Sequence, residues 1–206
     1  MLILHSGNLG AAIAQRLQNR HAAKVADLHE AGAMLEQFLP GQAFVGVAAW
    51  RPFSDLFRLI DTACFKYGIR WSSVTLNEFS LNCGPLVVPG RGACYHCYLQ
   101  RKESHNLASD WERAAQAYYT EHPQEGPLGY PQALVEIGAA ALAEDAMADA
   151  TPARIRSVDV LGAGVQESTV IGIHRCPRCR QRLGAHDPAQ RSVEILIPAI
   201  KELFNE

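Results

Sequence analysis

Four of the six cysteines in the sequence occur as two Cys-x-x-Cys pairs, Cys94–Cys97 and Cys176–Cys179. A spacer of two residues within a tight turn lets both sulfurs of a pair face one point, and two such pairs supply the four thiolates of a tetrahedral zinc site. The pairs lie far apart in the sequence, so a shared metal ion closes a large loop of chain. The spacing therefore predicts one structural Zn²⁺ ion that joins the middle of the chain to a segment near its C-terminus.

The alternative chemistry for either pair is a redox dithiol. Thioredoxin-like dithiols open a long helix after a first strand, and we expect neither pair to do so. Cys64 and Cys83 are interpreted as small buried hydrophobes, because no neighbouring His and Asn or Asp arrangement marks a nucleophile. Arginines beside the cysteine pairs either offset the negative charge of the thiolates or form a solvated surface, and both interpretations stay open. These arginines are Arg91, Arg175, Arg178, Arg180 and Arg182.

The composition is that of a globular domain. The chain has 206 residues, of which 48% are hydrophobic and 19% charged, and its formal net charge is −2. These values exclude disorder and a broad nucleic-acid-binding surface, and no basic stripe with interleaved aromatic residues supports one. The N-terminus is too short and too poor in basic residues for a signal peptide, and no run of about 20 apolar residues could cross a membrane. We therefore expect a cytoplasmic protein with neither nucleic acid nor a membrane as partner.

The N-terminal turn resembles half of a dinucleotide-binding motif. The window from His5 to Gly10 keeps the second and third glycines of G-x-G-x-x-G, Gly7 and Gly10, but has a histidine at the first position. Gly7 could let the backbone approach a phosphate, Gly10 would permit close packing of helix on strand, and Asp27 is a possible ribose ligand. A half-matched motif is weak evidence, so a Rossmann-type fold without a nucleotide is the favoured interpretation.

The order of expected elements predicts an α/β fold. The first half alternates strands and helices, which favours a Rossmann-like, mostly parallel sheet with flanking helices, and the segment before the second cysteine pair is typical of a hairpin. We expect strands at 2–4, 24–26, 43–48, 69–76, 78–83, 85–88, 154–160 and 166–173, and helices at 11–17, 31–38, 54–67, 109–119 and 132–147. A single domain, 1–206, would then comprise a Rossmann-like part (1–100), a helical crossover (101–150), and a hairpin, zinc knuckle and tail (151–206).

Two segments carry a resemblance to a known family. Residues 84–101, Gly-Pro-Leu-Val-Val-Pro-Gly-Arg-Gly-Ala-Cys-Tyr-His-Cys-Tyr-Leu-Gln-Arg, and the later Cys176-Pro177-Arg178-Cys179 are similar to the ubiquitin-activating-enzyme-like (ThiF-like) superfamily. Within it, the chain most resembles the ThiF-like partner proteins of YcaO cyclodehydratases, which make azole and azoline rings in ribosomally produced peptides. The resemblance extends from Met1 to about Cys179.

The resemblance implies a non-catalytic role. Adenylating members of the superfamily hold ATP with the full glycine motif, downstream basic residues and an aspartate at a later strand end, where this chain reads Val-Ala-Ala-Trp-Arg at 47–51. Without that carboxylate the Mg²⁺ and pyrophosphate of ATP have no clamp. The resemblance therefore implies a zinc-containing scaffold that docks with a YcaO-type enzyme and helps to present or clamp a ribosomal precursor peptide, and it also implies a homodimer. The alternative is an ATP-dependent adenylyltransferase.

The sequence also suggests where partners could bind. Many such partner proteins carry a winged-helix-like leader-recognition region, and we expect that region to be missing here or supplied by another polypeptide. The candidate contact surfaces are the loop at 126–131 and the tail from Ser192, whose apolar residues could instead form a helix packed on the protein's own core. These tail residues are Ile195, Leu196, Ile197 and Phe204.

Overall fold

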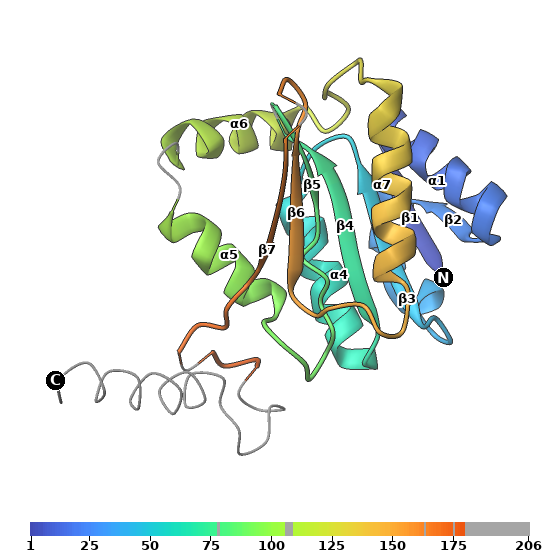
Figure 1. Cartoon of the computed structure of the whole chain (residues 1–206), viewed down its shortest axis with the longest axis vertical. Helices are drawn as coiled ribbons and strands as arrows, with labels where there is room; N and C mark the ends of the chain where they lie inside the picture. The colour runs from blue at the N-terminus through green and yellow to red at the C-terminus, as the bar shows by residue number, and fades with distance from the viewer. Residues whose placement is uncertain (78, 106–108, 163, 175, 180–206) are drawn as a thin grey trace, which may run out of the picture.

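A seven-stranded mixed sheet forms the centre of the computed structural model, which describes residues 1–77, 79–105, 109–162, 164–174 and 176–179 (Figure 1). The strand order is β2-β1-β3-β4-β5-β6-β7. Strands β1 to β4 are mutually parallel, and β5, β6 and β7 extend the sheet as an antiparallel meander. The strands are β1 (Leu2–Ser6), β2 (Lys24–Asp27), β3 (Phe44–Ala49), β4 (Arg70–Leu76), β5 (Ser80–Cys83), β6 (Arg154–Asp159) and β7 (Val165–Thr169).

Helices cover both faces of the sheet, which confirms the predicted α/β fold. Helices α1 (Gly7–His21) and α7 (Gln132–Asp145) pack on one face, and α2 (Leu28–Ala33), α3 (Leu35–Phe38) and α4 (Ser54–Tyr67) pack on the other. Two further helices, α5 (Tyr95–Ser104) and α6 (Ser109–Glu121), lie beside the antiparallel half of the sheet (Figure 1). Within the described ranges, no helix combines the length and apolarity needed to cross a membrane.

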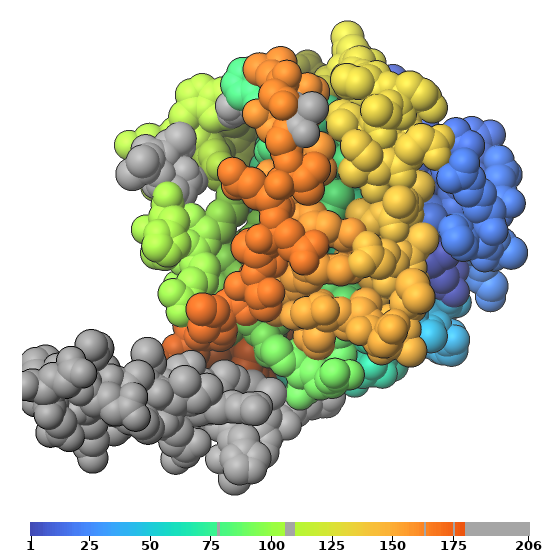
Figure 2. Space-filling view, viewed as in Figure 1, coloured from blue at the N-terminus to red at the C-terminus, as the bar shows by residue number. Residues whose placement is uncertain are grey.

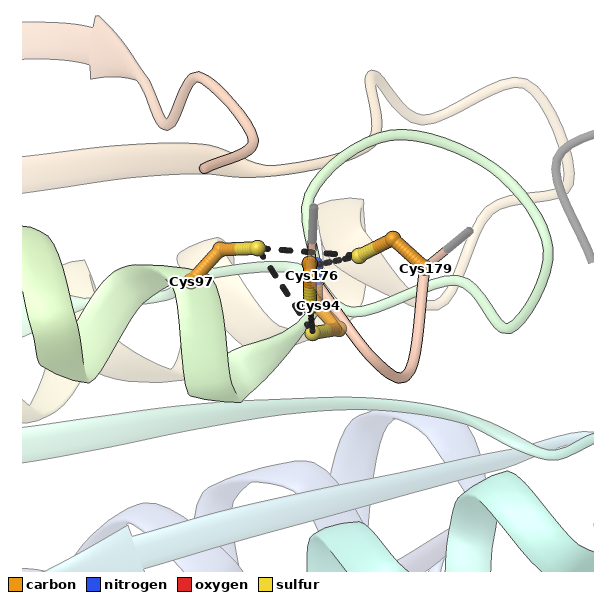
Figure 3. A group of neighbouring side chains, drawn as sticks. All are labelled: Cys94, Cys97, Cys176 and Cys179. Carbon is orange, nitrogen blue, oxygen red and sulfur yellow. Dashed lines mark hydrogen bonds between the residues drawn. The ribbon is translucent and has the colours of Figure 1, made fainter. Parts of the chain in front are cut away.

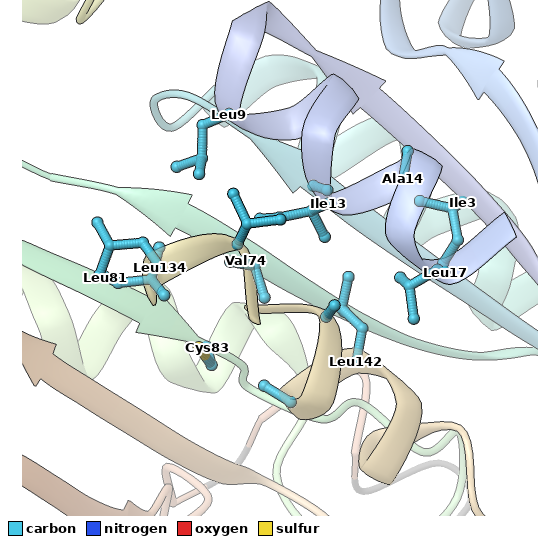
Figure 4. Close-up of a cluster of buried hydrophobic side chains, with 14 of the residues drawn as sticks. Ile3, Leu9, Ile13, Ala14, Leu17, Val74, Leu81, Cys83, Leu134 and Leu142 are labelled. Carbon is cyan, nitrogen blue, oxygen red and sulfur yellow. The ribbon is translucent and has the colours of Figure 1, made fainter. Parts of the chain in front are cut away.

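The two faces bury separate apolar cores. On one face, Ile13 of α1, Val74 of β4 and Leu142 of α7 belong to one fully buried cluster (Figure 4). Gly138 lets α7 lie close to α1, because a β-carbon there would come within 2.7 Å of the Ile13 side chain. On the other face, aromatic and aliphatic side chains of α4 pack against Trp71 of β4. Burial of this apolar area provides most of the stabilisation of the fold.

One predicted helix ends where the sequence indicated, and another is divided in two. Helix α4 ends as predicted at Gly68, which adopts φ +69° and donates its N–H to the carbonyls of Cys64 and Phe65. The helix expected at 31–38 is instead two short helices. Asp27 caps the first of them, and the chain breaks between them at Met34, where φ is −134°.

The segment around the first cysteine pair differs from the sequence prediction in two ways: one expected strand is absent, and one helix was not predicted. Residues 85–88 do not form a strand: Gly84 has φ +108°, the chain turns out of the ladder, and two isolated bridges follow, Trp71 with Val87 and Val88 with Arg91. Helix α5, which the sequence did not predict, begins directly after Cys94. That helix follows β5 rather than the first strand of the sheet.

Candidate metal centre and the carboxyl edge of the sheet

The structure brings the four predicted cysteines together (Figure 3). Cys94 and Cys97 lie at the start of α5, and Cys176 and Cys179 lie in the segment that follows β7. The sulfur–sulfur distances are 3.8 Å for Cys94–Cys97, 3.7 Å for Cys94–Cys176 and 3.6 Å for Cys97–Cys179. A disulfide requires about 2.05 Å, whereas Zn–S bonds of about 2.3 Å place tetrahedral sulfurs about 3.8 Å apart. The geometry therefore fits a four-thiolate metal site.

The surroundings also suit thiolates. The backbone N–H of Cys94 donates to Sγ of Cys179 at 3.3 Å, and the N–H of Ile173 donates to Sγ of Cys97 at 3.4 Å. Backbone N–H donors of this kind hold and orient the ligands of structural zinc sites. The four side chains would hold the ion, which would supply a cross-link and no reaction step.

An ion pair fixes the second cysteine pair to α4. Arg178, between Cys176 and Cys179, donates from Nη1 to Oδ2 of Asp61, and Asp61 Oδ1 also accepts from Trp71 Nε1 at 3.1 Å. Asp61 is 1% exposed. Burial raises its pKa, and the charge of Arg178 acts in the opposite direction. The sequence did not indicate this contact, because Asp61 lies far from the cysteines along the chain.

Arg178 therefore donates its hydrogen bonds to Asp61, through Nη1 to the carboxylate and through Nη2 to the backbone carbonyl. Arg91, a second arginine considered as a counter-charge, is exposed to solvent. Arg175, Arg180 and Arg182 lie outside the described residues.

Away from the cysteines, Trp50 fills the place where a dinucleotide phosphate would lie. Ligands of doubly wound folds bind where the strand order reverses, here at the carboxyl ends of β1 and β3. Trp50 follows β3 directly, its backbone N–H donates to the Ser6 carbonyl at 3.1 Å, and its indole lies against Gly7. A β-carbon on Gly7 would overlap the indole ring, so the backbone there faces an aromatic side chain.

The other two candidate nucleotide ligands have structural roles. Gly10 lets α1 lie against β3, since a β-carbon there would overlap the carbonyl of Ala48, as the sequence predicted for close helix–strand packing. Asp27 caps α2: its Oδ1 accepts from the backbone N–H of His29 at 2.8 Å and of Glu30 at 3.1 Å. These hydrogen bonds give Oδ1 of Asp27 the role of a helix N-cap.

Arg51 ties the loop after α6 over this edge of the sheet. The residue is 6% exposed, and its guanidinium donates to the carbonyls of Glu125 at 2.9 Å and Pro123 at 3.1 Å. The same group stacks on the rings of Phe53 and Tyr119, at 4.0 and 4.4 Å from their centroids. In the same loop, Gly126 lies against the Trp50 indole. A β-carbon on Gly126 would come within 2.7 Å of Cδ2 of Trp50. The loop therefore holds the indole in place.

A groove of about 540 Å³ lies beside Arg51, between the start of α4, the β4–β5 turn and α6. Its lining combines aromatic side chains with a few polar groups, as small-molecule and peptide sites often do. The sequence-predicted contact loop at 126–131 contributes Pro127 to it, and the predicted tail residues from Ser192 onward lie outside the described residues. The aromatic lining residues are Phe53, Phe79, Trp111 and Tyr119.

The two remaining cysteines are buried, as the sequence suggested. Cys64 lies on the buried side of α4, and Cys83 ends β5. Burial raises the pKa of each thiol to about 12. Neither is a thiolate at neutral pH, so neither is a nucleophile.

Comparison with known proteins gives matches only in structure. The sequence matches no protein-family model and no curated protein. The heterocyclase TruD superposes with a TM-score of 0.61 at 16% identity over 86% of this chain and 27% of its own. The E. coli microcin synthetase McbBCD complex contains a chain with a TM-score of 0.59 at 12% identity (85% and 66% covered), and E. coli MccB with ATP gives 0.55 at 13% (87% and 66%). This chain thus spans about a quarter of TruD and shares its fold with the heterocyclase TruD and with a chain of the microcin synthetase complex.

Proposed function

We propose that this chain is the non-catalytic, zinc-containing scaffold subunit of a YcaO-type cyclodehydratase complex that acts in the cytoplasm. In this role it presents a ribosomal precursor peptide during azole or azoline formation. The observation that carries the proposal is the position of Trp50 at the switch point of the sheet, against Gly7. The structural similarity to a heterocyclase and to a chain of a microcin synthetase complex supports it.

The carboxyl edge of the sheet lacks what ATP needs. A nucleotide phosphate binds where the N–H groups at a helix N-terminus are open to it, and the indole of Trp50 covers Gly7 at the start of α1. The end of β3 offers Trp50 and Arg51 where a magnesium ligand would need a carboxylate. In the complex that we propose, peptide activation by ATP belongs to the partner enzyme, and this chain contributes binding.

The groove beside Arg51 gives the scaffold a place to hold a peptide. Extended peptides bind through aromatic and aliphatic contacts and a few oriented polar groups. This groove offers Trp111, Phe79 and Tyr119 together with the Lys102–Glu112 ion pair. Trp111 is 59% exposed in the free chain, which is unusual for so large an apolar ring. Burial of this ring against a peptide would contribute favourable free energy.

Reconstitution tests the proposal. The full chain, a YcaO enzyme encoded beside it and the precursor peptide encoded with them are combined with ATP, and ring formation is followed by mass spectrometry as the loss of one water per ring. We expect omission of this chain to abolish ring formation, and Trp111→Ser to raise the peptide concentration needed for half-maximal rate. Tyr67→Ser, which removes an exposed aromatic ring outside the groove, is the matched control.

The proposal is wrong if ring formation proceeds unchanged without the chain and the chain does not co-purify with the YcaO enzyme. The adenylyltransferase alternative predicts ATP–pyrophosphate exchange by the isolated chain in the presence of an acceptor. Detection of that exchange, with its loss on substitution of Gly7, would replace the scaffold proposal by an enzymatic one.

A further inference from the structure

The outer edge of the sheet at β7 is unprotected. All five residues of β7 are exposed, and within the described part of the chain no strand pairs with its outer side. Soluble proteins usually protect such edges with lysine, proline, a bulge or a covering element. The opposite edge strand, β2, is short and begins with Lys24, whereas β7 contains neither lysine nor proline. Figure 2 shows the β6–β7 hairpin, in orange, uncovered on this face.

The backbone pattern determines which groups face outward. On either side of β7, the Gly164 carbonyl accepts from the backbone N–H of Asp159 at 2.8 Å, and the backbone N–H of Val170 donates to the Ala153 carbonyl at 2.8 Å. The even-numbered residues of this strand therefore direct their backbone N–H and C=O groups toward β6. The odd-numbered residues therefore direct their N–H and C=O groups to the free edge, because the two directions alternate in an antiparallel ladder. These residues are Val165, Glu167 and Thr169.

We propose that β7 pairs with β7 of a second copy of this chain, antiparallel, about a two-fold axis at Ser168. This places the free groups of Glu167 opposite those of Thr169 of the second copy. It also places Val165 opposite Ile171 of the second copy, which lies just beyond the strand. These two apolar residues are 65% and 66% exposed in the single chain, and they would meet on one face of the joined sheet. The result is one continuous sheet through both copies, formed by the same patch on each.

The chain just beyond the strand limits the length of the new ladder. The Ile171 carbonyl already accepts from Nε of Arg101 at 3.2 Å. The new backbone hydrogen bonds are therefore those of the two symmetry-related Glu167–Thr169 pairs, and Ile171 contributes its side chain.

The neighbouring registers are less favourable. Centring the axis on Glu167 sets two like charges directly opposite each other, which destabilises a strand pair. Centring it on Gln166 sets Ile171 opposite the β6–β7 turn, where no strand continues, and separates it from Val165 of the second copy. The register at Ser168 is the one in which charge separation and apolar contact coincide. The pairing is independent of the groove and of the proposed peptide-presenting role.

Site-directed cross-linking tests both the interface and its register. Ser168 would be a non-hydrogen-bonded pair, with Cα atoms about 4.5 Å apart across the axis, which is within disulfide range. Residue 166 would lie about 13 Å from its own counterpart, four residues along the partner strand. We expect Ser168→Cys to form a disulfide-linked dimer in oxidised glutathione. Gln166→Cys and the unmodified chain should remain uncrosslinked.

The molar mass of the protein in solution provides a second test of the β7–β7 interface. By light scattering after size-exclusion chromatography, we expect the unmodified full chain to be a dimer. Ser168→Lys should shift it to monomer by setting two ammonium groups opposite each other, while Ala140→Lys on the exposed side of α7 should leave the dimer intact. The proposal is overturned if the unmodified chain is monomeric at all concentrations, if Ser168→Lys remains dimeric, or if positions 166 and 168 cross-link equally. A monomer that binds peptide through this edge also overturns it.

Discussion

Replacing Arg178 by methionine tests how the second cysteine pair is held on α4. Methionine keeps an apolar stem near Phe65 but removes the guanidinium, which leaves Asp61 with the indole N–H of Trp71. Because Asp61 is 1% exposed, water cannot replace the lost partner, and breaking a buried pair in this way costs about 3–5 kcal/mol. Arg178 itself is 27% exposed, so we expect the free energy of unfolding to fall by about 3 kcal/mol, the lower end of that range.

The reverse substitution should be milder. Asp61→Asn still accepts the hydrogen bond from Trp71, and the freed guanidinium can turn toward solvent, so we expect a loss of about 1 kcal/mol. The double variant Asp61→Asn/Arg178→Met removes the buried charge together with its partner. It should therefore be more stable than Arg178→Met alone.

Urea unfolding followed by tryptophan fluorescence gives the free energies, and a colorimetric assay measures the zinc content of each variant beside that of the unmodified chain. The control is Arg113→Met, which breaks an exposed pair with Asp110 and should change nothing measurable. The reasoning is refuted if Arg178→Met behaves like this control, or if the double variant loses as much stability as Arg178→Met.

The same variant has a definite pH dependence. Burial raises the pKa of Asp61, and removal of the Arg178 charge raises it further. A carboxyl group whose folded pKa exceeds its unfolded pKa weakens the folded state as the pH rises from the unfolded to the folded value. The deficit of Arg178→Met should therefore shrink as the pH is lowered from the folded pKa of Asp61 to its unfolded pKa, over the range in which a bound metal ion would be retained.

Three further predictions concern the metal, the packing and the buried thiols. Cys97→Ser should lose the metal, so that elemental analysis falls from one zinc per chain to none, and amide hydrogen exchange should rise in residues 170–174 and 94–97. Gly10→Ala should lower the free energy of unfolding by about 1–3 kcal/mol through overlap with the Ala48 carbonyl. The control is Gly129→Ala, because a β-carbon on Gly129 would meet no atom within 4 Å. Cys64 and Cys83, with pKa values of about 12, should resist iodoacetamide in the folded protein and react only after unfolding, as counted by mass spectrometry.

The cysteine cluster could be predicted because its signal is local. A two-residue spacer fixes the geometry of each pair, and the metal needs four sulfurs whatever the rest of the fold does. The packing role of Gly10 and the end of α4 at Gly68 were predictable for the same reason, since each depends on one residue and its immediate neighbours.

The contacts that decide function were not predictable, because they join distant parts of the chain. Trp50 lies against Gly7 and Gly126 only after the sheet and the loop have formed. Asp61 meets Arg178 in the same way. The sequence alone offered Asp27 as a ribose ligand, but a carboxylate before a short helix caps it with equal ease, and here the cap forms.

The manner in which Arg51 holds its loop bears on how this protein can evolve. The guanidinium donates to main-chain carbonyls, which every amino acid provides, so the side chains of the loop are not part of that attachment. Apart from Gly126, which must stay small beside the Trp50 indole, the loop can therefore exchange its side chains, and with them the rim of the adjoining groove, while its path over the sheet stays the same. A single arginine thus lets related chains vary the lining of this groove without rebuilding the edge of the sheet.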